Sequence, residues 1–136
     1  MPIHIARPLV NRILGQALCA PEQEICGLIG ARDGTPQTVY PVANVAAERD
    51  RLFAMDPQQQ IDAMRRMREN DETLFAIYHS HPHAPAVPSA LDLAQAAYPE
   101  VLYLIVSLNT KGVLEMQGYR LRGRHMEPVE LAMITD

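Results

Sequence analysis

The stretch "TLFAIYHSHPHAPAVPSALD", residues 73–92, determines how the rest of the chain is interpreted. Residues 73–81 begin with apolar side chains on both alternating faces, as expected for a strand inside a covered sheet. Three of the chain's five histidines then fall within residues 79–83. A proline-rich connection leads from them to Ser89 and Asp92. The pattern predicts that polar side chains gather where a buried strand leaves the sheet.

Three segments have the apolar spacing of helices, two before this stretch and one that overlaps its end. In the middle one, Asp56 is the expected N-cap and Pro57 takes the first helical position. The side chains expected to face the core from this helix are those of Ile61, Met64 and Met67. The three helices are predicted at residues 7–20, 55–70 and 88–98.

Apolar runs bounded by turn residues predict the strands. They are expected at residues 24–31, 37–46, 73–81, 100–108, 113–121 and 126–134, with a turn at 108–112. Helices and strands alternate first, and strands cluster at the end. This order predicts an α/β fold, an α+β sandwich with a mixed central β-sheet flanked by helices. A chain of 136 residues fits one domain, so residues 1–136 are expected to form a single domain.

Composition excludes several classes of partner and location. A net charge of -4 argues against nucleic acid, because a phosphate binder normally has a basic face. No apolar run is long enough to span a bilayer, and the first residues lack the layout of a signal peptide, so no membrane association is expected. Cys19 and Cys26 are separated by six residues, wider than a zinc-ribbon pair, and are expected to be reduced thiols of a cytoplasmic protein.

Two histidines at the end of the predicted strand 73–81 have the geometry of metal ligands. His79 and His81 project from the same face of a strand, with Cα atoms about 6.5–7 Å apart, so both imidazoles can reach one ion. A His-x-His pair is a weak signal by itself, and Ser89 with Asp92 also matches a helix capping box. If Asp92 binds a metal, its carboxylate is less free to complete the cap. We therefore expect one of these two duties to dominate.

In combination these residues match a known signature. His79-Ser80-His81-Pro82, six residues, Ser89, two residues and Asp92 resemble the motif of the JAMM metallopeptidases, also called MPN-plus domains. Residues of these types at this fixed spacing arise by chance in a chain of this size with odds on the order of 10⁻⁵ or below. The family also has a glutamate upstream of a short apolar strand, and "PEQEICGLIG", residues 21–30, resembles that element. The resemblance covers most of the chain.

The resemblance implies a role for each matched position. His79, His81 and Asp92 correspond to three zinc ligands, with the fourth position left to a water whose pKa the metal lowers. Glu24 corresponds to the general base that takes a proton from this water and later gives one to the leaving amine. Ser89 corresponds to the serine whose hydroxyl helps to stabilise the tetrahedral oxyanion. The implied cofactor is Zn²⁺.

Several neighbouring residues remain open. Glu22 competes with Glu24 for the role of base, and Glu24 is preferred because it stands three residues before Gly27, as in the family pattern. His83 is either an exposed loop histidine or a residue that acts near the ligands or the substrate. Cys26 is either a buried strand thiol or a lining residue of the cleft. Zinc-deaminase chemistry, whose fold has similar layers, needs a Pro-Cys-x-x-Cys together with a His-x-Glu, and no Pro-Cys-x-x-Cys occurs.

The resemblance implies a zinc-dependent peptidase or isopeptidase that cuts after the Gly-Gly tail of a ubiquitin-like protein. A tail without side chains can lie flat along a sheet edge and bind through its main chain. The compact chain is most similar to the bacterial branch of the family, which acts on small sulfur-carrier proteins. Two alternatives stay open: an inert scaffold of the same fold that binds other proteins, and a zinc hydrolase of a small molecule or cell-wall peptide.

Overall fold

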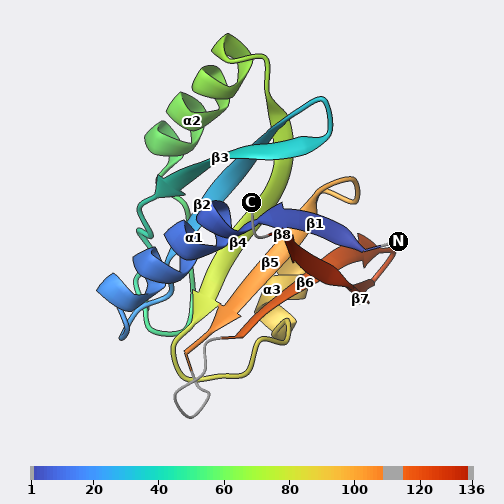
Figure 1. Cartoon of the computed structure of the whole chain (residues 1–136). Helices are drawn as coiled ribbons and strands as arrows, with labels where there is room; N and C mark the ends of the chain where they lie inside the picture. The colour runs from blue at the N-terminus through green and yellow to red at the C-terminus, as the bar shows by residue number, and fades with distance from the viewer. Residues whose placement is uncertain (1, 109–114, 135–136) are drawn as a thin grey trace.

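The computed structural model describes residues 2–108 and 115–134 of the chain (Figure 1). Part of the predicted turn at 108–112 and the start of the predicted strand at 113–121 lie outside the described residues. The elements, in chain order, are β1 (Ile3–Ala6), α1 (Arg7–Cys19), β2 (Cys26–Arg32), β3 (Thr35–Val42), α2 (Pro57–Glu69), β4 (Thr73–His81), α3 (Ala90–Gln95), β5 (Leu102–Ser107), β6 (Glu115–Arg122), β7 (His125–Val129) and β8 (Leu131–Ile134).

A six-stranded sheet forms the centre of the fold, with the strand order β3-β2-β4-β5-β6-β7. β4 runs parallel to β5, and the other neighbours in this sheet are antiparallel. The predicted mixed sheet is therefore confirmed. β4 occupies the interior of the sheet, where His79 is held by the ladders to both β2 and β5 and His81 by the ladder to β5.

The two ends of the chain form a separate pair of parallel strands, β1 and β8. Neither was predicted as it stands: β1 has only four residues, and β8 was expected to be part of one closing strand at 126–134. Instead β7 pairs with β6 in the central sheet, and the chain then leaves that sheet so that β8 pairs with β1. The apolar residues of one predicted strand thus serve two sheets.

Two apolar layers cover the central sheet, one on each face. α1 and the β1–β8 pair pack on one face, and α2 packs on the other. Because side chains alternate along a strand, Ala76 and Tyr78 of β4 belong to the α1 layer while Ile77 belongs to the α2 layer. By the same alternation His79 and His81 face the α2 side.

The start of α2 follows the prediction, but part of its predicted inner face is wrong. The Asp56 carboxylate accepts a hydrogen bond from the main-chain N–H of Gln59 at 2.9 Å, as an N-cap does. Ile61, however, is 60% exposed, whereas Ala63 and Met67 are buried. Ile61 lies two residues before Ala63, about 200° around the helix, so it points away from the sheet.

None of the helices in the described part of the chain is long and apolar enough to cross a membrane. Both cysteines are free thiols, as the sequence predicted; Cys19 is exposed and Cys26 is buried.

Candidate metal centre

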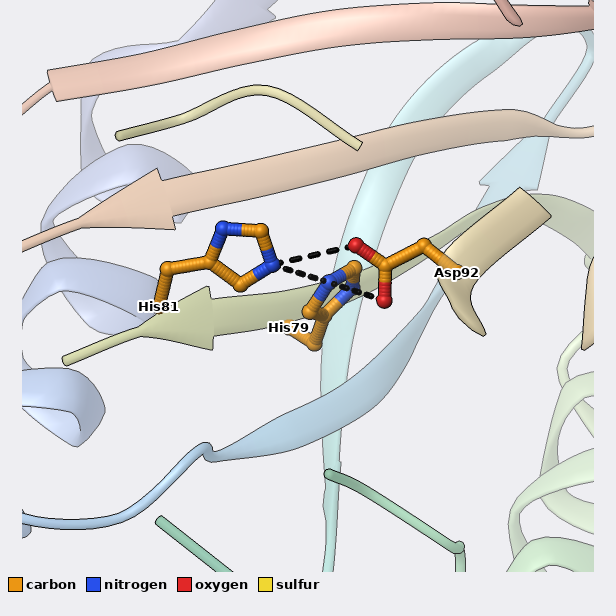
Figure 2. Close-up of side chains that lie close together, drawn as sticks. All are labelled: His79, His81 and Asp92. Atoms are coloured by element: carbon orange, nitrogen blue, oxygen red, sulfur yellow. Dashed lines mark hydrogen bonds and ion pairs between the residues drawn. The ribbon is translucent and has the colours of Figure 1, made fainter. Parts of the chain in front are cut away.

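Three side chains from two elements converge at the end of β4 (Figure 2). His79 and His81 are the last alternate residues of β4, and Asp92 lies in the first turn of α3. The two imidazole Nε2 atoms are 3.2 Å apart. His79 Nε2 lies 3.2 Å from Asp92 Oδ1, and His81 Nε2 lies 3.0 Å from Asp92 Oδ2. The two histidines are buried and the aspartate side chain is 10% exposed, so the cluster is shielded but open at one side.

The donor atoms fit a metal ion in both spacing and chemistry. His81 Nδ1 lies 2.8 Å from the carbonyl oxygen of Pro85. A carbonyl only accepts, so Nδ1 carries the hydrogen and, in the neutral ring, Nε2 turns its lone pair to the cluster. Three corners of a tetrahedron around zinc lie about 3.3–3.4 Å apart for metal–ligand bonds of about 2.0–2.1 Å. The observed separations of 3.0–3.2 Å are close to that spacing. These three residues can therefore hold a metal ion.

Asp92 both faces the imidazoles and completes the cap of α3, so the prediction that one duty would dominate is wrong. Asp92 Oδ2 accepts a hydrogen bond from the main-chain N–H of Ser89 at 2.8 Å, and the Ser89 hydroxyl accepts one from the main-chain N–H of Asp92 at 3.0 Å. A carboxylate has two oxygens with several lone pairs, and Oδ1 is turned to His79. The capping box therefore orients the carboxylate toward the cluster.

The charges in the cluster support one another. Burial alone would raise the pKa of Asp92, but the hydrogen bonds from His79 and His81 hold it well below its usual range. Burial lowers the pKa of His79. Burial also opposes protonation of His81, yet the hydrogen bonds with Asp92 and Pro85 raise its pKa overall. Asp92 is thus an anion at neutral pH, which suits a carboxylate that binds a cation.

Glu24 lies two residues before β2, outside the strand in which it was predicted. Its side chain is 4% exposed, and among the described residues its Oε1 atom has no hydrogen-bond partner. Burial, the largest cause, together with the carboxylates of Asp92 and Asp50 raises the pKa of Glu24 to about 7, against an opposing contribution from His81. A buried, unpartnered carboxylate with this pKa is available to exchange a proton near neutral pH.

The cluster separates two hollows. Glu24, His81 and Ser89 line one of about 410 Å³, so the structure brings the predicted base, one ligand and the predicted serine to the same opening. His79 and Asp92 line the other, of about 240 Å³, whose wall is largely apolar. The apolar residues of that wall include Phe53, Met55, Ile77, Ala96, Tyr98, Tyr103, Ile105 and Met126.

Three residues that support the site were not predicted from the sequence. The ring of Phe53 stacks on that of His79, with centroids 4.5 Å apart and planes 21° apart. The Asn44 amide donates to the carbonyl oxygens of Glu24 and Leu52, both at 2.9 Å. Pro85 orients His81, as described above. Only the tertiary structure brings these three residues to the site. In the sequence they lie within "RLFAMDP" (residues 51–57), "YPVANVA" (residues 40–46) and the proline-rich connection, and nothing local to these segments marks a role at the site.

The competing candidates lie apart from the centre. Glu22 and His83 are exposed and face each other at 3.7 Å, Nε2 to Oε2. His83 lines the rim of the larger hollow but does not join the metal cluster. The Cys26 thiol is buried, donates to the carbonyl oxygen of Val42 at 3.4 Å, and its pKa is raised to about 12, chiefly by burial. It is a buried strand thiol that stays protonated at neutral pH.

A mixed sheet with a His-His-Asp centre at the end of an interior strand defines a class of metal-binding domain, and comparison with known sequences gives the family. The family described as "Prokaryotic homologs of the JAB domain" matches residues 6–121. The chain belongs to this family.

Individual relatives agree with this assignment. A desampylase of Haloferax volcanii is 37% identical over 90 residues, which are 64% of this chain and 64% of that protein. A CysO-cysteine peptidase of Mycobacterium tuberculosis is 32% identical over 120 residues, 86% of this chain and 81% of that protein. Among solved structures, a protein of Desulfitobacterium hafniense is 31% identical and superposes with a TM-score of 0.87 over 98% of this chain and 94% of that one.

Proposed function

We propose that this protein is a zinc-dependent peptidase or isopeptidase that hydrolyses the bond following the C-terminal tail of a ubiquitin-like or sulfur-carrier protein. The observation that carries the proposal is the meeting of three metal-ligating side chains with a buried glutamate. His79, His81 and Asp92 offer donor atoms 3.0–3.2 Å apart, and Glu24 lines the same hollow as His81, with Oε1 unpartnered among the described residues. A buried carboxylate oxygen without a hydrogen bond costs stability, so its presence beside the three ligands favours a chemical role over that of an inert scaffold.

The three ligands would bind Zn²⁺, because two neutral imidazoles and one carboxylate suit this ion and leave a coordination position open. Zinc bound there supplies Lewis acidity, by which it acidifies a water molecule and polarises a carbonyl group. The Nδ1–H of His81 is held by Pro85 and the carboxylate of Asp92 by its capping box, so both ligands are oriented before any ion binds.

Glu24 is proposed to act as the general base and then as the general acid. Its carboxylate takes a proton from the attacking water and gives one to the nitrogen of the leaving amine. A group that does both works best with a pKa near the operating pH, and burial has moved the pKa of Glu24 to about 7. A cation held by the neighbouring ligands would lower this pKa again and so favour the ionised, proton-accepting form.

Ser89 is proposed to stabilise negative charge on the substrate oxygen. Its hydroxyl oxygen accepts the hydrogen bond of the Asp92 N–H in the capping box. The hydroxyl proton is therefore left for donation into the hollow that Ser89 shares with Glu24. A preorganised donor of this kind contributes about 10²–10³ in rate when it faces a developing oxyanion.

The relatives support the class of substrate. They include a desampylase, a CysO-cysteine peptidase and, in Thermus thermophilus, a probable TtuB-protein conjugate cleaving protease. The hollow beside His79, with its apolar wall, and the hollow beside Glu24 lie on the two sides of the cluster. An extended tail that crosses the cluster would place its acyl part and its leaving group in separate surroundings.

We also propose that residues 1–136 act as one domain, and that the free thiols reflect a cytoplasmic location.

The proposal is tested with a ubiquitin-like or sulfur-carrier protein that carries a short extension after its Gly-Gly tail. The purified protein is expected to release the extension, to lose this activity on treatment with a chelator, and to regain it with zinc. The matched control is Asp92→Asn, which keeps the size of the side chain but weakens metal binding. Activity that persists in the fully chelated protein would contradict the proposal, as would the absence of cleavage by a zinc-loaded protein across a panel of such tails.

A further inference from the structure

Ser80 stands between the two histidines on β4, but its side chain points to the opposite face of the sheet. It is fully buried. The Ser80 hydroxyl accepts a hydrogen bond from the main-chain N–H of Ile25 at 2.8 Å and faces the carbonyl oxygen of Gln23 at 3.4 Å. One side chain of the histidine-bearing strand therefore contacts the residues immediately before and after Glu24.

These contacts lie where the ladder between β2 and β4 ends. The last pair in this ladder is Cys26 with His79, and Ile25 with Ser80 would be the next. The main-chain N–H of Ser80 donates to the carbonyl oxygen of Ile25 at 3.0 Å, as in a hydrogen-bonded antiparallel pair. In such a pair the Ile25 N–H would donate to the main-chain carbonyl of Ser80, but here the Ser80 hydroxyl takes that place. The chain preceding β2 can then turn out of the sheet at Glu24.

The main chain of Glu24 is also held from its other side. Its N–H donates to the carbonyl oxygen of Arg49 at 2.6 Å, and its carbonyl oxygen accepts from the Asn44 amide at 2.9 Å. These two contacts tie Glu24 to the loop at residues 44–54. The contacts of Ser80 tie the same segment to the strand that carries His79 and His81.

We propose that Ser80 is a positioning residue for the hydrolysis, because its hydroxyl fixes the Glu24 segment relative to the two histidines. The inference rests on the proposed function, in which Glu24 moves the proton. A reacting group misplaced by about 1 Å can cost on the order of 10²-fold in rate. Among the described residues, the Ser80 hydroxyl makes its hydrogen bonds to main-chain atoms of Ile25 and Gln23 and not to either imidazole, so its loss is expected to leave the metal ligands in place.

The test compares three variants. Ser80→Ala removes the hydroxyl, and Ser80→Thr keeps it. Tyr78→Phe is the matched control: Tyr78 lies two residues earlier on the same face of β4, and its hydroxyl donates to Gln16 on α1, whereas the Ser80 hydroxyl contacts the main chain of Gln23 and Ile25. Ser80→Ala is expected to retain the zinc content and to change KM less than about threefold, but to lower kcat by about 10–100-fold. Ser80→Thr recovers most of kcat, and Tyr78→Phe keeps it.

A second measurement does not depend on activity. In the zinc-free protein, amide hydrogen exchange at Ile25 is expected to be slow in the wild type and in Ser80→Thr, and at least about tenfold faster in Ser80→Ala, while Leu28 in the middle of β2 stays slow in all three. This measurement on the wild type decides the matter even if Ser80→Ala does not fold.

Three results would overturn the inference: rapid exchange of the Ile25 amide in the wild type, an unchanged kcat in Ser80→Ala, or a kcat that falls only in proportion to lost zinc. If the wild type cleaves no tail at all, the proposed function fails, whereas the exchange at Ile25 still reports whether Ser80 holds the segment.

Discussion

Glu24 and Glu72 are both buried glutamates that lie just before a strand of the central sheet, and their surroundings differ completely. Glu72 is 6% exposed and accepts hydrogen bonds from the Thr38 hydroxyl at 2.7 Å and the Tyr40 hydroxyl at 2.5 Å. Its carboxylate lies over Gly30, where an added Cβ would come within 2.5 Å of Oε1. Glu24 is 4% exposed, and in the part of the chain that the structure describes its Oε1 atom has no hydrogen-bond partner.

The difference separates a structural carboxylate from one that is available for chemistry. A buried polar group with its hydrogen bonds made contributes to a unique packing, here between β3 and the start of β4. A buried polar group without them destabilises the fold, and such groups persist mainly where function requires them. Burial alone would not have distinguished the two residues, since their exposed fractions are nearly equal.

The largest expected effect is on catalysis by Glu24→Gln. This variant keeps the size of the side chain but cannot accept a proton, so the cleavage rate is expected to fall by about 10²–10⁴-fold with zinc content unchanged. The measurement is release of the extension from a carrier fusion, with elemental analysis of the same samples. Equal rates in wild type and variant would remove Glu24 from its proposed role and leave the two glutamates without a functional distinction.

The next effect concerns the structural carboxylate. Thr38→Val combined with Tyr40→Phe removes both hydroxyl donors to Glu72 and is expected to lower the free energy of unfolding by about 2–4 kcal/mol. kcat should stay the same, because none of these residues lines the hollows beside the metal cluster. Urea unfolding gives the stability. Adding Glu72→Met removes the carboxylate that has lost its donors and is expected to recover part of the lost free energy of unfolding. If the triple variant were instead less stable than the double variant, the Glu72 carboxylate would not depend on these two hydroxyl donors.

A smaller effect is expected in the pH dependence of stability of the zinc-free protein. The pKa of Glu24 is raised from 4.5 to about 7, so the folded protein binds the proton more tightly than the unfolded chain. The stability tied to this proton is complete below about pH 4.5 and is lost as the pH rises to about 7. Glu24→Gln does not undergo this loss. Its stability relative to the wild type is therefore expected to be near zero at pH 4 and to rise to about 1–3 kcal/mol at pH 8, allowing for partial solvent screening. Thermal unfolding across this range measures it, and an advantage that grew toward acid pH would contradict it.

The smallest effect is expected at Glu22, the competing candidate for the base. Its side chain is 83% exposed and contacts only His83, at 3.7 Å, among the interactions described for the site. Glu22→Gln is expected to change kcat and KM by less than about twofold, since exposed ion pairs of this kind contribute little. If Glu22→Gln lowered kcat as much as Glu24→Gln, the choice of Glu24 as the base, which was made from its position three residues before Gly27, would be wrong.

Much of the fold followed from local patterns. The strand at residues 73–81 was predicted with the bounds it has in the structure, because a short continuous apolar run bounded by turn residues is typical of a buried strand. The N-cap at Asp56 was also predicted correctly, because capping depends on the residue type at one position and on its immediate neighbours. Ile61 was misplaced because its neighbours fit a helical stripe in two ways, and only the sheet beneath α2 selects Ala63 and Met67. The pairing of β1 with β8 joins the two ends of the chain, which no short window of sequence can indicate.

The sequence by itself determined which metal-ligating and polar side chains the candidate site contains, because the type and spacing of His79, His81, Ser89 and Asp92 are a property of one continuous stretch of chain. Only the tertiary structure decided which glutamate faces that stretch, that Asp92 serves the cap and the cluster together, and that Ser80 holds the segment of Glu24. The physical reason is that burial and hydrogen bonding are set by residues distant in sequence, whereas side-chain direction along a strand is set by its immediate neighbours.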